Sequence, residues 1–217
     1  MPGLELLHRD TWIAAFSKPS GLLVHRGWGD DDVVAVDLAR EALGLRVHPA
    51  HRLDRGTSGV LLFALSPEAA AALGACFEQG RVQKTYLALV RGVTPDEGRI
   101  DHPIPRREDG PRVPAATSFR RLGVFERFSL VEARPETGRL HQVRRHLKHI
   151  SHPIVGDVNY GKGEINRLFR ERFGLRRLAL HAAELSLVHP FTGEALTIEA
   201  PLPEDLRGPL SEMGLTP

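Results

Sequence analysis

The densest group of residues able to do chemistry lies between positions 51 and 59, directly before an apolar stretch. Asp54 stands there between Arg52 and Arg55, and this nearby positive charge favours the ionised form of its carboxylate. The Gly-Thr-Ser-Gly run at 56–59 predicts a turn at a strand edge, where a reactive side chain can meet a substrate. Asp54 is therefore a candidate reactive residue. A structural ion pair with an Asx-type turn would explain the same segment.

A second charged group follows the turn predicted over 135–138. Cationic side chains occupy one side of a helix predicted from 139 to 150, at i, i+3, i+4 and i+7: His141, Arg144, Arg145 and Lys148. Such a face can bind phosphates or hold a carboxylate from elsewhere in the fold. The alternative is the solvated face of an amphipathic helix with an apolar stripe at Leu140, Val143 and Leu147.

A third candidate is Tyr86, one of only two tyrosines in the chain. It lies in a strand predicted over 84–90, where its ring either belongs to the core or presents a flat face to a base. No metal site is expected. The histidines at 141, 146, 149 and 152 lack the spacing of a ligand set, and the single cysteine, Cys76, cannot supply one.

Six segments, taken together and in order, resemble the large pseudouridine synthase family that modifies ribosomal and transfer RNA. They are Lys18-Pro19-Ser20-Gly21, His51-Arg52-Leu53-Asp54 followed by Thr57-Ser58-Gly59, Lys84-Thr85-Tyr86, Thr137-Gly138-Arg139 with His141-Gln142-Val143-Arg144, His152-Pro153-Ile154-Val155-Gly156-Asp157, and Leu180-His181-Ala182. The resemblance covers residues 12 to 200, nearly the whole chain. It implies an enzyme that isomerises a uridine in structured RNA to pseudouridine.

The resemblance also implies roles for individual residues. Asp54 corresponds to the catalytic aspartate, Arg144 to its cationic partner and Tyr86 to the ring that stacks on the target uracil. Arg52 corresponds to the residue that fills the gap left by the flipped nucleotide. Neighbouring residues of the same motifs are expected to contact RNA: His51, Arg55, Arg139 and His141. The family chemistry implies no cofactor and no metal, and the step taken by the aspartate stays open.

Within the family, the segments 146–149, 161–170 and 189–193 resemble the branch that acts on uridine 65 of tRNA. The closest rivals are a relative acting on ribosomal RNA or on both RNA types, and a non-catalytic RNA-binding protein of the same fold. A non-catalytic descendant could lose Asp54, Tyr86 or Arg144, and all three positions are filled here.

The charge distribution also favours a polyanionic partner. The net charge is only +2, yet residues 99–177 hold 18 Lys and Arg against nine Asp and Glu, while the remainder is acidic. A basic segment of this kind is typical of an RNA-binding face. There is no apolar run of membrane-spanning length and no signal-peptide pattern at the N-terminus, and the single cysteine fits a reducing compartment. We therefore expect a cytoplasmic protein with structured RNA, most simply tRNA, as its partner and no membrane association.

The expected fold is α+β, the pseudouridine synthase fold: a mixed, mostly antiparallel sheet in two halves with flanking helices and a central cleft. Strands are predicted over 12–16, 22–25, 59–65, 84–90, 117–121, 129–134, 178–188 and 195–199. Helices are predicted from a cap at Asp31 and Asp32 to 43, and over 67–79, 139–150 and 164–173. Residues 92–114 read as an exposed basic excursion. We expect residues 1–217 to form one catalytic domain without an N-terminal RNA-binding module, and the protein to be a monomer.

Overall fold

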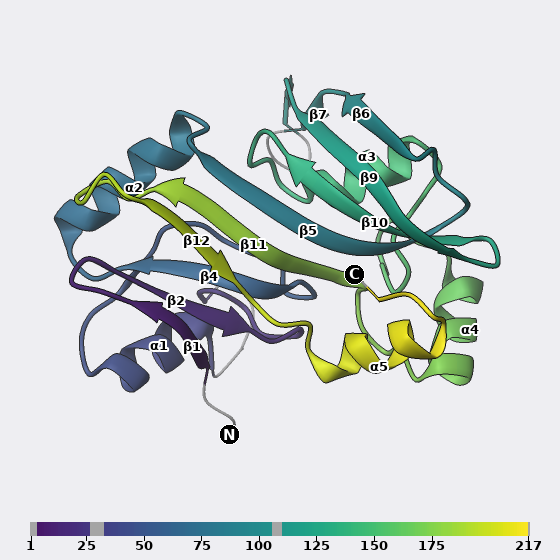
Figure 1. Cartoon of the computed structure of the whole chain (residues 1–217), viewed down its shortest axis with the longest axis horizontal. Helices are drawn as coiled ribbons and strands as arrows, with labels where there is room; N and C mark the ends of the chain where they lie inside the picture. Colours follow the sequence, from purple (N-terminus) through teal and green to yellow (C-terminus); the bar gives the residue numbers. More distant parts are fainter. Residues whose placement is uncertain (1–3, 27–32, 106–109, 217) are drawn as a thin grey trace. The chain divides into compact units, whose positions relative to one another are not determined.

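The computed structural model describes residues 4–26, 33–105 and 110–216, and these form two compact units (Figure 1). Unit 1 comprises Met1–Lys84 and Ala182–Pro201, and unit 2 comprises Thr85–His181 and Leu202–Pro217. The chain leaves unit 1 within strand β5 (Val82–Arg91) and returns to it within β11 (Leu180–Val188). The mixture of helices with a mostly antiparallel sheet confirms the expected α+β class.

Unit 1 is built on antiparallel strands. The strand β2 (Ile13–Lys18) lies between β1 (Glu5–Arg9) and β4 (Ser58–Ala64), while β3 (His48–Pro49) also pairs with β4 and β12 (Ala195–Glu199) pairs with β11. All seven residues of β4 are buried, as its unbroken apolar run predicts. The helix α2 (Pro67–Glu78) begins where the sequence predicts, with the Ser66 hydroxyl accepting the Ala69 N–H at 3.1 Å.

Two sequence predictions in unit 1 are wrong. Residues 22–25 form no strand, and helix α1 (Ala35–Leu43) has Val34 as its N-cap. Asp31 and Asp32, the predicted caps, lie outside the described residues. The apolar side chain of Val24 is buried without a strand, because the loop after Gly21 pairs instead with the start of α1: the N–H groups of Ala35 and Val36 donate to the carbonyls of Leu23 and Val24.

Gly59 in β4 shows why the segment after Asp54 needs a glycine. Its φ is +117°, and a Cβ built there would lie 2.1 Å from the Ala182 carbonyl oxygen of β11. No side chain fits at that distance from a backbone atom, so any other residue must displace one of the two strands. The glycine thereby allows the strand that follows the Asp54 turn to lie directly against β11.

Unit 2 contains a second run of antiparallel strands, in the order β5, β10 (Phe128–Pro135), β9 (Ala116–Phe125) and β6 (Glu97–Asp101). The short strands β7 (Ile104–Pro105) and β8 (Arg112–Val113) form a separate pair. Parts of the segment predicted as an exposed excursion form strands instead, and Ile100 and Ile104 bury their side chains; the arginines at 106 and 107 lie outside the described residues.

Three helices complete unit 2: α3 (Gln142–His149), α4 (Gly163–Phe173) and α5 (Glu204–Glu212). Phe169 of α4 packs edge-on against Phe128 of β10 with ring centroids 4.6 Å apart, in a core that α5 joins through Leu206 and Leu210. The sequence predicted α4 correctly and missed α5. Within the part of the chain that the structure describes, none of the helices combines the length and apolar character needed to cross a bilayer.

Candidate active site

Asp54 lies on the loop between β3 and β4, on a tight turn of unit 1. Its carbonyl accepts the Thr57 N–H at 3.0 Å, which closes the turn around Arg55 and Gly56. Leu53 on one side and Thr57 on the other are buried and anchor the turn, whereas Asp54 itself is half-buried. The turn therefore presents the carboxylate at the beginning of a rigid buried strand, as the sequence predicted for a reactive group.

The segment Lys18-Pro19-Ser20-Gly21 holds this turn in place. Lys18 is fully buried, and its ammonium donates to the carbonyls of Pro19 (2.9 Å), Leu22 (2.7 Å) and Arg55 (3.2 Å). Two further bonds join the segments: the Ser20 hydroxyl donates to the Gly56 carbonyl at 2.8 Å, and the Gly21 N–H donates to the Arg55 carbonyl at 2.8 Å. The first motif of the chain thus fixes the backbone on which Asp54 stands.

Replacing Lys18 by Met is expected to lower the free energy of unfolding by about 2–4 kcal/mol, because it removes a fully buried ammonium together with its hydrogen bonds to three carbonyls. The activity of the folded fraction should fall as well, since the Arg55 carbonyl belongs to the Asp54 turn. Urea unfolding and turnover measurements test this, with the exposed Lys162→Met as control. Equal stabilities of the two variants would contradict the proposed role of Lys18 in holding the turn.

His51 and the two arginines beside Asp54 have different surroundings. Arg52 and Arg55 are exposed, although the Arg55 guanidinium also donates through Nε to the Gly21 carbonyl at 3.1 Å. The His51 ring stacks on Phe77, its Nε2 accepts the Leu62 N–H at 3.1 Å, and burial lowers its pKa to about 3. His51 is therefore a neutral residue that supports β4, and it makes a poor candidate for the RNA contact that its position predicted.

Tyr86 lies in β5, within unit 2, directly opposite Ala133 of β10. Its ring is half-buried and packs against the apolar core of that unit. The two interpretations from the sequence therefore both have support: one part of the ring contacts the core while the rest stays accessible. Its stacking on a uracil stays a prediction.

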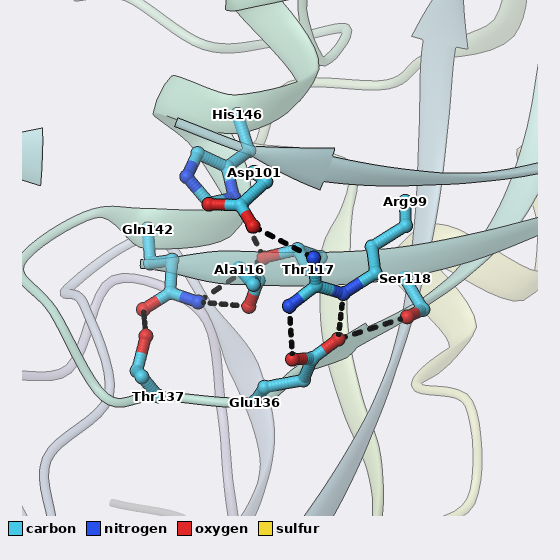
Figure 2. Close-up of polar contacts among 9 residues, drawn as sticks. All are labelled: Arg99, Asp101, Ala116, Thr117, Ser118, Glu136, Thr137, Gln142 and His146. Atoms are coloured by element: carbon cyan, nitrogen blue, oxygen red, sulfur yellow. Dashed lines mark hydrogen bonds and ion pairs between the residues drawn. The ribbon is translucent and has the colours of Figure 1, made fainter. Parts of the chain in front are cut away.

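The turn at 137–141 and the beginning of α3 are joined by the side chain of Gln142, which is buried. Figure 2 shows its amide donating to the Ala116 carbonyl at 2.8 Å and to the Thr117 hydroxyl at 3.1 Å, both in β9. Its carbonyl accepts the Thr137 hydroxyl at 2.6 Å and the Arg139 N–H at 3.0 Å. The predicted helix thus begins at Gln142 rather than at 139, because residues 137–141 form a turn that ends with His141 in the left-handed conformation.

His146 continues this network into the interior. Its Nε2 faces the His102 carbonyl at 2.9 Å and must carry the proton, so Nδ1 accepts the Thr117 hydroxyl at 2.8 Å (Figure 2). Burial lowers the pKa of His146. The neutral ring fits because the Thr117 hydroxyl already accepts a hydrogen bond from Gln142 and needs an acceptor for its own proton. His146 therefore fixes α3 to β9.

A more exposed ion pair lies beside this network. The Arg99 guanidinium contacts both carboxylate oxygens of Glu136 at 2.8 Å and also Asp101 at 2.7 Å (Figure 2). The hydrogen bonds from Arg99 lower the pKa of Glu136. Because these groups are open to solvent, the pair fixes the direction of the Glu136 side chain more than it stabilises the fold.

Arg144 holds a carboxylate from elsewhere in the fold, which is one of the two roles predicted for the cationic face, and it does not lie on a solvated face. It is buried and forms a two-pronged ion pair with Asp157, with Nε–Oδ2 at 2.7 Å and a second N–O distance of 2.9 Å. Burial alone would raise the pKa of Asp157, but hydrogen bonds from Arg144 and from the N–H groups of Asn159 and Tyr160 outweigh it and lower the pKa. The pairing of Arg144 with Asp54 stays a prediction.

Asp157 is a site residue that sequence reasoning did not single out, although it ends the motif His152–Asp157. The signal in the sequence is that Asp157 follows two apolar residues and a glycine. In the structure both apolar residues are buried, and Asp157 lies inside the fold beside Arg144 of the charged helix. Both oxygens of Asp157 face Arg144, so the carboxylate holds the guanidinium in one orientation. The sequence found the cation but not the residue that positions it.

The remaining two expected RNA contacts, Arg139 and His141, also belong to unit 2. Arg139 is exposed, with Nε 3.4 Å from the Pro114 carbonyl, and the Nδ1 of His141 lies 3.0 Å from the Tyr160 hydroxyl. Of the eight predicted site residues, His51, Arg52, Asp54 and Arg55 belong to unit 1, and Tyr86, Arg139, His141 and Arg144 belong to unit 2. That the two sets form one site stays a prediction.

Among the described residues, no three His, Cys, Asp or Glu side chains are grouped to hold a metal.

Comparison with known proteins finds relatives that match nearly the whole chain. A family model described as RNA pseudouridylate synthase matches residues 13–149. A protein from Salmonella typhimurium named tRNA pseudouridine synthase C is 44% identical, with 97% of this chain and 90% of the relative covered. Its namesake from Vibrio cholerae is 41% identical, with 97% and 96% covered. The solved structure of human RNA pseudouridylate synthase domain containing 4 has a TM-score of 0.81 and 29% identity, covering 98% of this chain and 94% of the human chain.

Proposed function

Because the chain belongs to the RNA pseudouridylate synthase family, we propose that it converts one uridine of tRNA to pseudouridine, with Asp54 as the catalytic residue. The activity of the family is the isomerisation of uridine in RNA. The proposal of tRNA as the substrate is supported by relatives that are more than 40% identical over nearly their full length and are named for tRNA. Uridine 65 is the position that we propose, from the resemblance of segments 146–149, 161–170 and 189–193.

The observation that carries the assignment of Asp54 is the turn on which it stands. A buried ammonium, a hydroxyl and a backbone N–H all bind the carbonyls of Arg55 and Gly56, directly after Asp54. These bonds fix the backbone beside Asp54, which is the kind of support that a catalytic side chain requires. The half-buried carboxylate is reachable by a substrate and rests on an unyielding backbone.

The reaction is an internal rearrangement with no change in oxidation state. The bond from uracil N1 to C1′ of the ribose breaks, a bond from C5 to C1′ forms, C5 loses its proton and N1 gains one. We propose that Asp54 starts this exchange as nucleophile or base, and that Tyr86 stacks on the uracil and assists removal of the C5 proton. We propose that Arg144, which Asp157 holds in one orientation, is the cationic partner of Asp54.

The target nucleotide must leave the helical stack before Asp54 can reach it, at a cost of a few kcal/mol. We propose that Arg52 fills the vacated place and that Arg55, Arg139 and His141 contact the RNA around it, because all four lie at least partly open to solvent. His51 keeps the structural role described above. We propose further that the enzyme acts as a cytoplasmic monomer.

The function is tested by incubating the protein with unmodified tRNA transcripts and mapping pseudouridine by carbodiimide-based sequencing. One new pseudouridine, at position 65, is the expected result. Modification of ribosomal RNA but not of tRNA would show that the protein is a pseudouridine synthase whose substrate is ribosomal RNA. Tight binding of both RNAs without modification of either would overturn the proposal.

A further inference from the structure

Tyr160 gathers an unusual number of cations in unit 2. The guanidinium carbons of Arg144 and Arg145 lie 5.0 and 5.7 Å from the centre of its ring, and the Lys148 ammonium lies 5.8 Å away. The phenol oxygen also accepts a hydrogen bond from Arg145 Nε at 2.8 Å and lies 3.0 Å from His141 Nδ1. We call these five residues the Tyr160 cluster. Three cations within 6 Å of one ring repel one another, so an arrangement of this kind suits an anion.

The cluster is built by the fold rather than assembled from loose surface side chains. Asp157 accepts the Tyr160 N–H at 3.0 Å and at the same time holds Arg144, so one buried carboxylate fixes both the ring and the first cation. Arg145 and Lys148 follow on the same helix, at the spacing that places them over the ring. The ring and its cations are therefore in position before any ligand arrives.

The charges of the cluster are only partly balanced. Asp157 neutralises Arg144, whereas neither Arg145 nor Lys148 has a carboxylate partner within residues 4–26, 33–105 and 110–216. Arg145 is half-buried and donates to the Tyr160 hydroxyl and the Pro105 carbonyl. Counted over the described residues, the cluster has a surplus of two positive charges beside an aromatic ring.

The hydrogen bonds around the phenol also orient His141. Since Arg145 Nε donates to the phenol oxygen, the phenol can give its own proton to His141 Nδ1. We assign the ring proton of His141 to Nε2 for this reason. The cluster thus combines a guanidinium, an ammonium and an imidazole N–H, which are the donors that recognise a phosphate.

We propose that the Tyr160 cluster binds a phosphodiester of the RNA backbone, with Lys148 and Arg145 as its contacts. The inference rests on the proposed function only in taking RNA as the partner. A backbone phosphate carries one negative charge, which Arg145 and Lys148 can bind together. The ring of Tyr160 fixes where these two cations lie relative to Arg144. The cluster would set the position of the RNA without reading its sequence.

The test compares two lysines of unit 2 by the same substitution. Lys148 and Lys162 are both exposed, but only Lys148 contacts Tyr160. Lys148→Gln should weaken binding of a tRNA transcript about threefold to tenfold and reduce the slope of log K against log salt by about one. Lys162→Gln should give less than half of either change. Equal effects of the two variants, or an unchanged slope for Lys148→Gln, would overturn the proposal.

Two further arms separate the remaining explanations. Tyr160→Leu, checked for folding by thermal melting, should weaken binding as Lys148→Gln does, while Tyr160→Phe, which keeps the ring, should retain most of the affinity.

Inorganic phosphate at constant ionic strength should compete poorly with the tRNA transcript. If phosphate competed strongly in a way that depends on Lys148, and Lys148→Gln left the affinity for RNA unchanged, the cluster would be reassigned to a free anion. Lys148-dependent RNA binding without pseudouridine formation would reject the proposed function and leave this inference intact.

Discussion

Replacing Asp54 by Asn is expected to reduce pseudouridine formation about a thousandfold or more while leaving the affinity for RNA within about threefold of the parent. The amide has nearly the same shape as the carboxylate, so the turn closed by the Asp54 carbonyl and the Thr57 N–H should survive. What is lost is the negative charge and the ability to accept a proton or bond to carbon. Turnover therefore suffers and binding does not.

The measurement pairs single-turnover kinetics on a tRNA transcript with a binding titration of the same RNA. Asp96→Asn, which changes an exposed carboxylate of unit 2 in the same way, is the matched control and should keep the activity of the parent. If Asp54→Asn and Asp96→Asn turned over equally, Asp54 would not be the catalytic residue. A parallel loss of turnover and binding would instead give Asp54 a role in holding RNA.

Replacing Asp157 by Asn is expected to have the largest effect on stability, about 3–5 kcal/mol, because it leaves the buried guanidinium of Arg144 without its counter-charge. The substitution also weakens the acceptor for the N–H groups of Asn159 and Tyr160, so the turn after β-bridge residue Ile154 loses its anchor. Urea unfolding measures the loss. The comparison is Glu136→Gln, which breaks an equally well-formed but exposed pair with Arg99 and should change stability far less.

The same pair predicts a dependence of stability on pH. The pKa of Asp157 in the folded protein lies below the usual value of 3.8, so the folded state favours the ionised carboxylate. Its contribution is fully present above pH 4 and is lost as the pH falls through the lower, folded pKa. In acid titrations the parent should therefore lose stability below pH 4 more steeply than Asp157→Asn. Parallel curves for the two proteins would show that the ion pair contributes little.

The sequence identified the segments that carry the candidate site because each segment is local. The Asp54 turn follows from a Gly-Thr-Ser-Gly run before an apolar strand, and α2 follows from a serine cap with proline at the first helical position. These features depend on neighbours within a few residues. Six motifs in the expected order were then enough to identify the family, and the family-model match over residues 13–149 confirms this identification.

The sequence could not show which polar side chains are buried. A helical projection of 141–148 places Arg144 and Lys148 on one side, yet Arg144 is buried and Lys148 is exposed, because Asp157 from a later segment draws the guanidinium inward. His51, beside two arginines, is likewise expected from the motif to contact RNA. Burial, with a smaller effect of the Lys84 charge, lowers its pKa to about 3, and its ring stacks on Phe77, which is 26 residues away along the chain. Long-range partners of this kind have no local signal.

The discontinuous composition of both units has a consequence for the order of biosynthesis. All eight predicted site residues have been translated by residue 144, but the core of unit 1 still lacks Leu185 and Ile198, and that of unit 2 lacks Leu206 and Leu210. Neither core can close while the ribosome is still making β11. The nascent chain therefore carries its candidate site residues before either unit is complete: unit 1 is complete at Pro201, and unit 2 is complete only after α5 has been made.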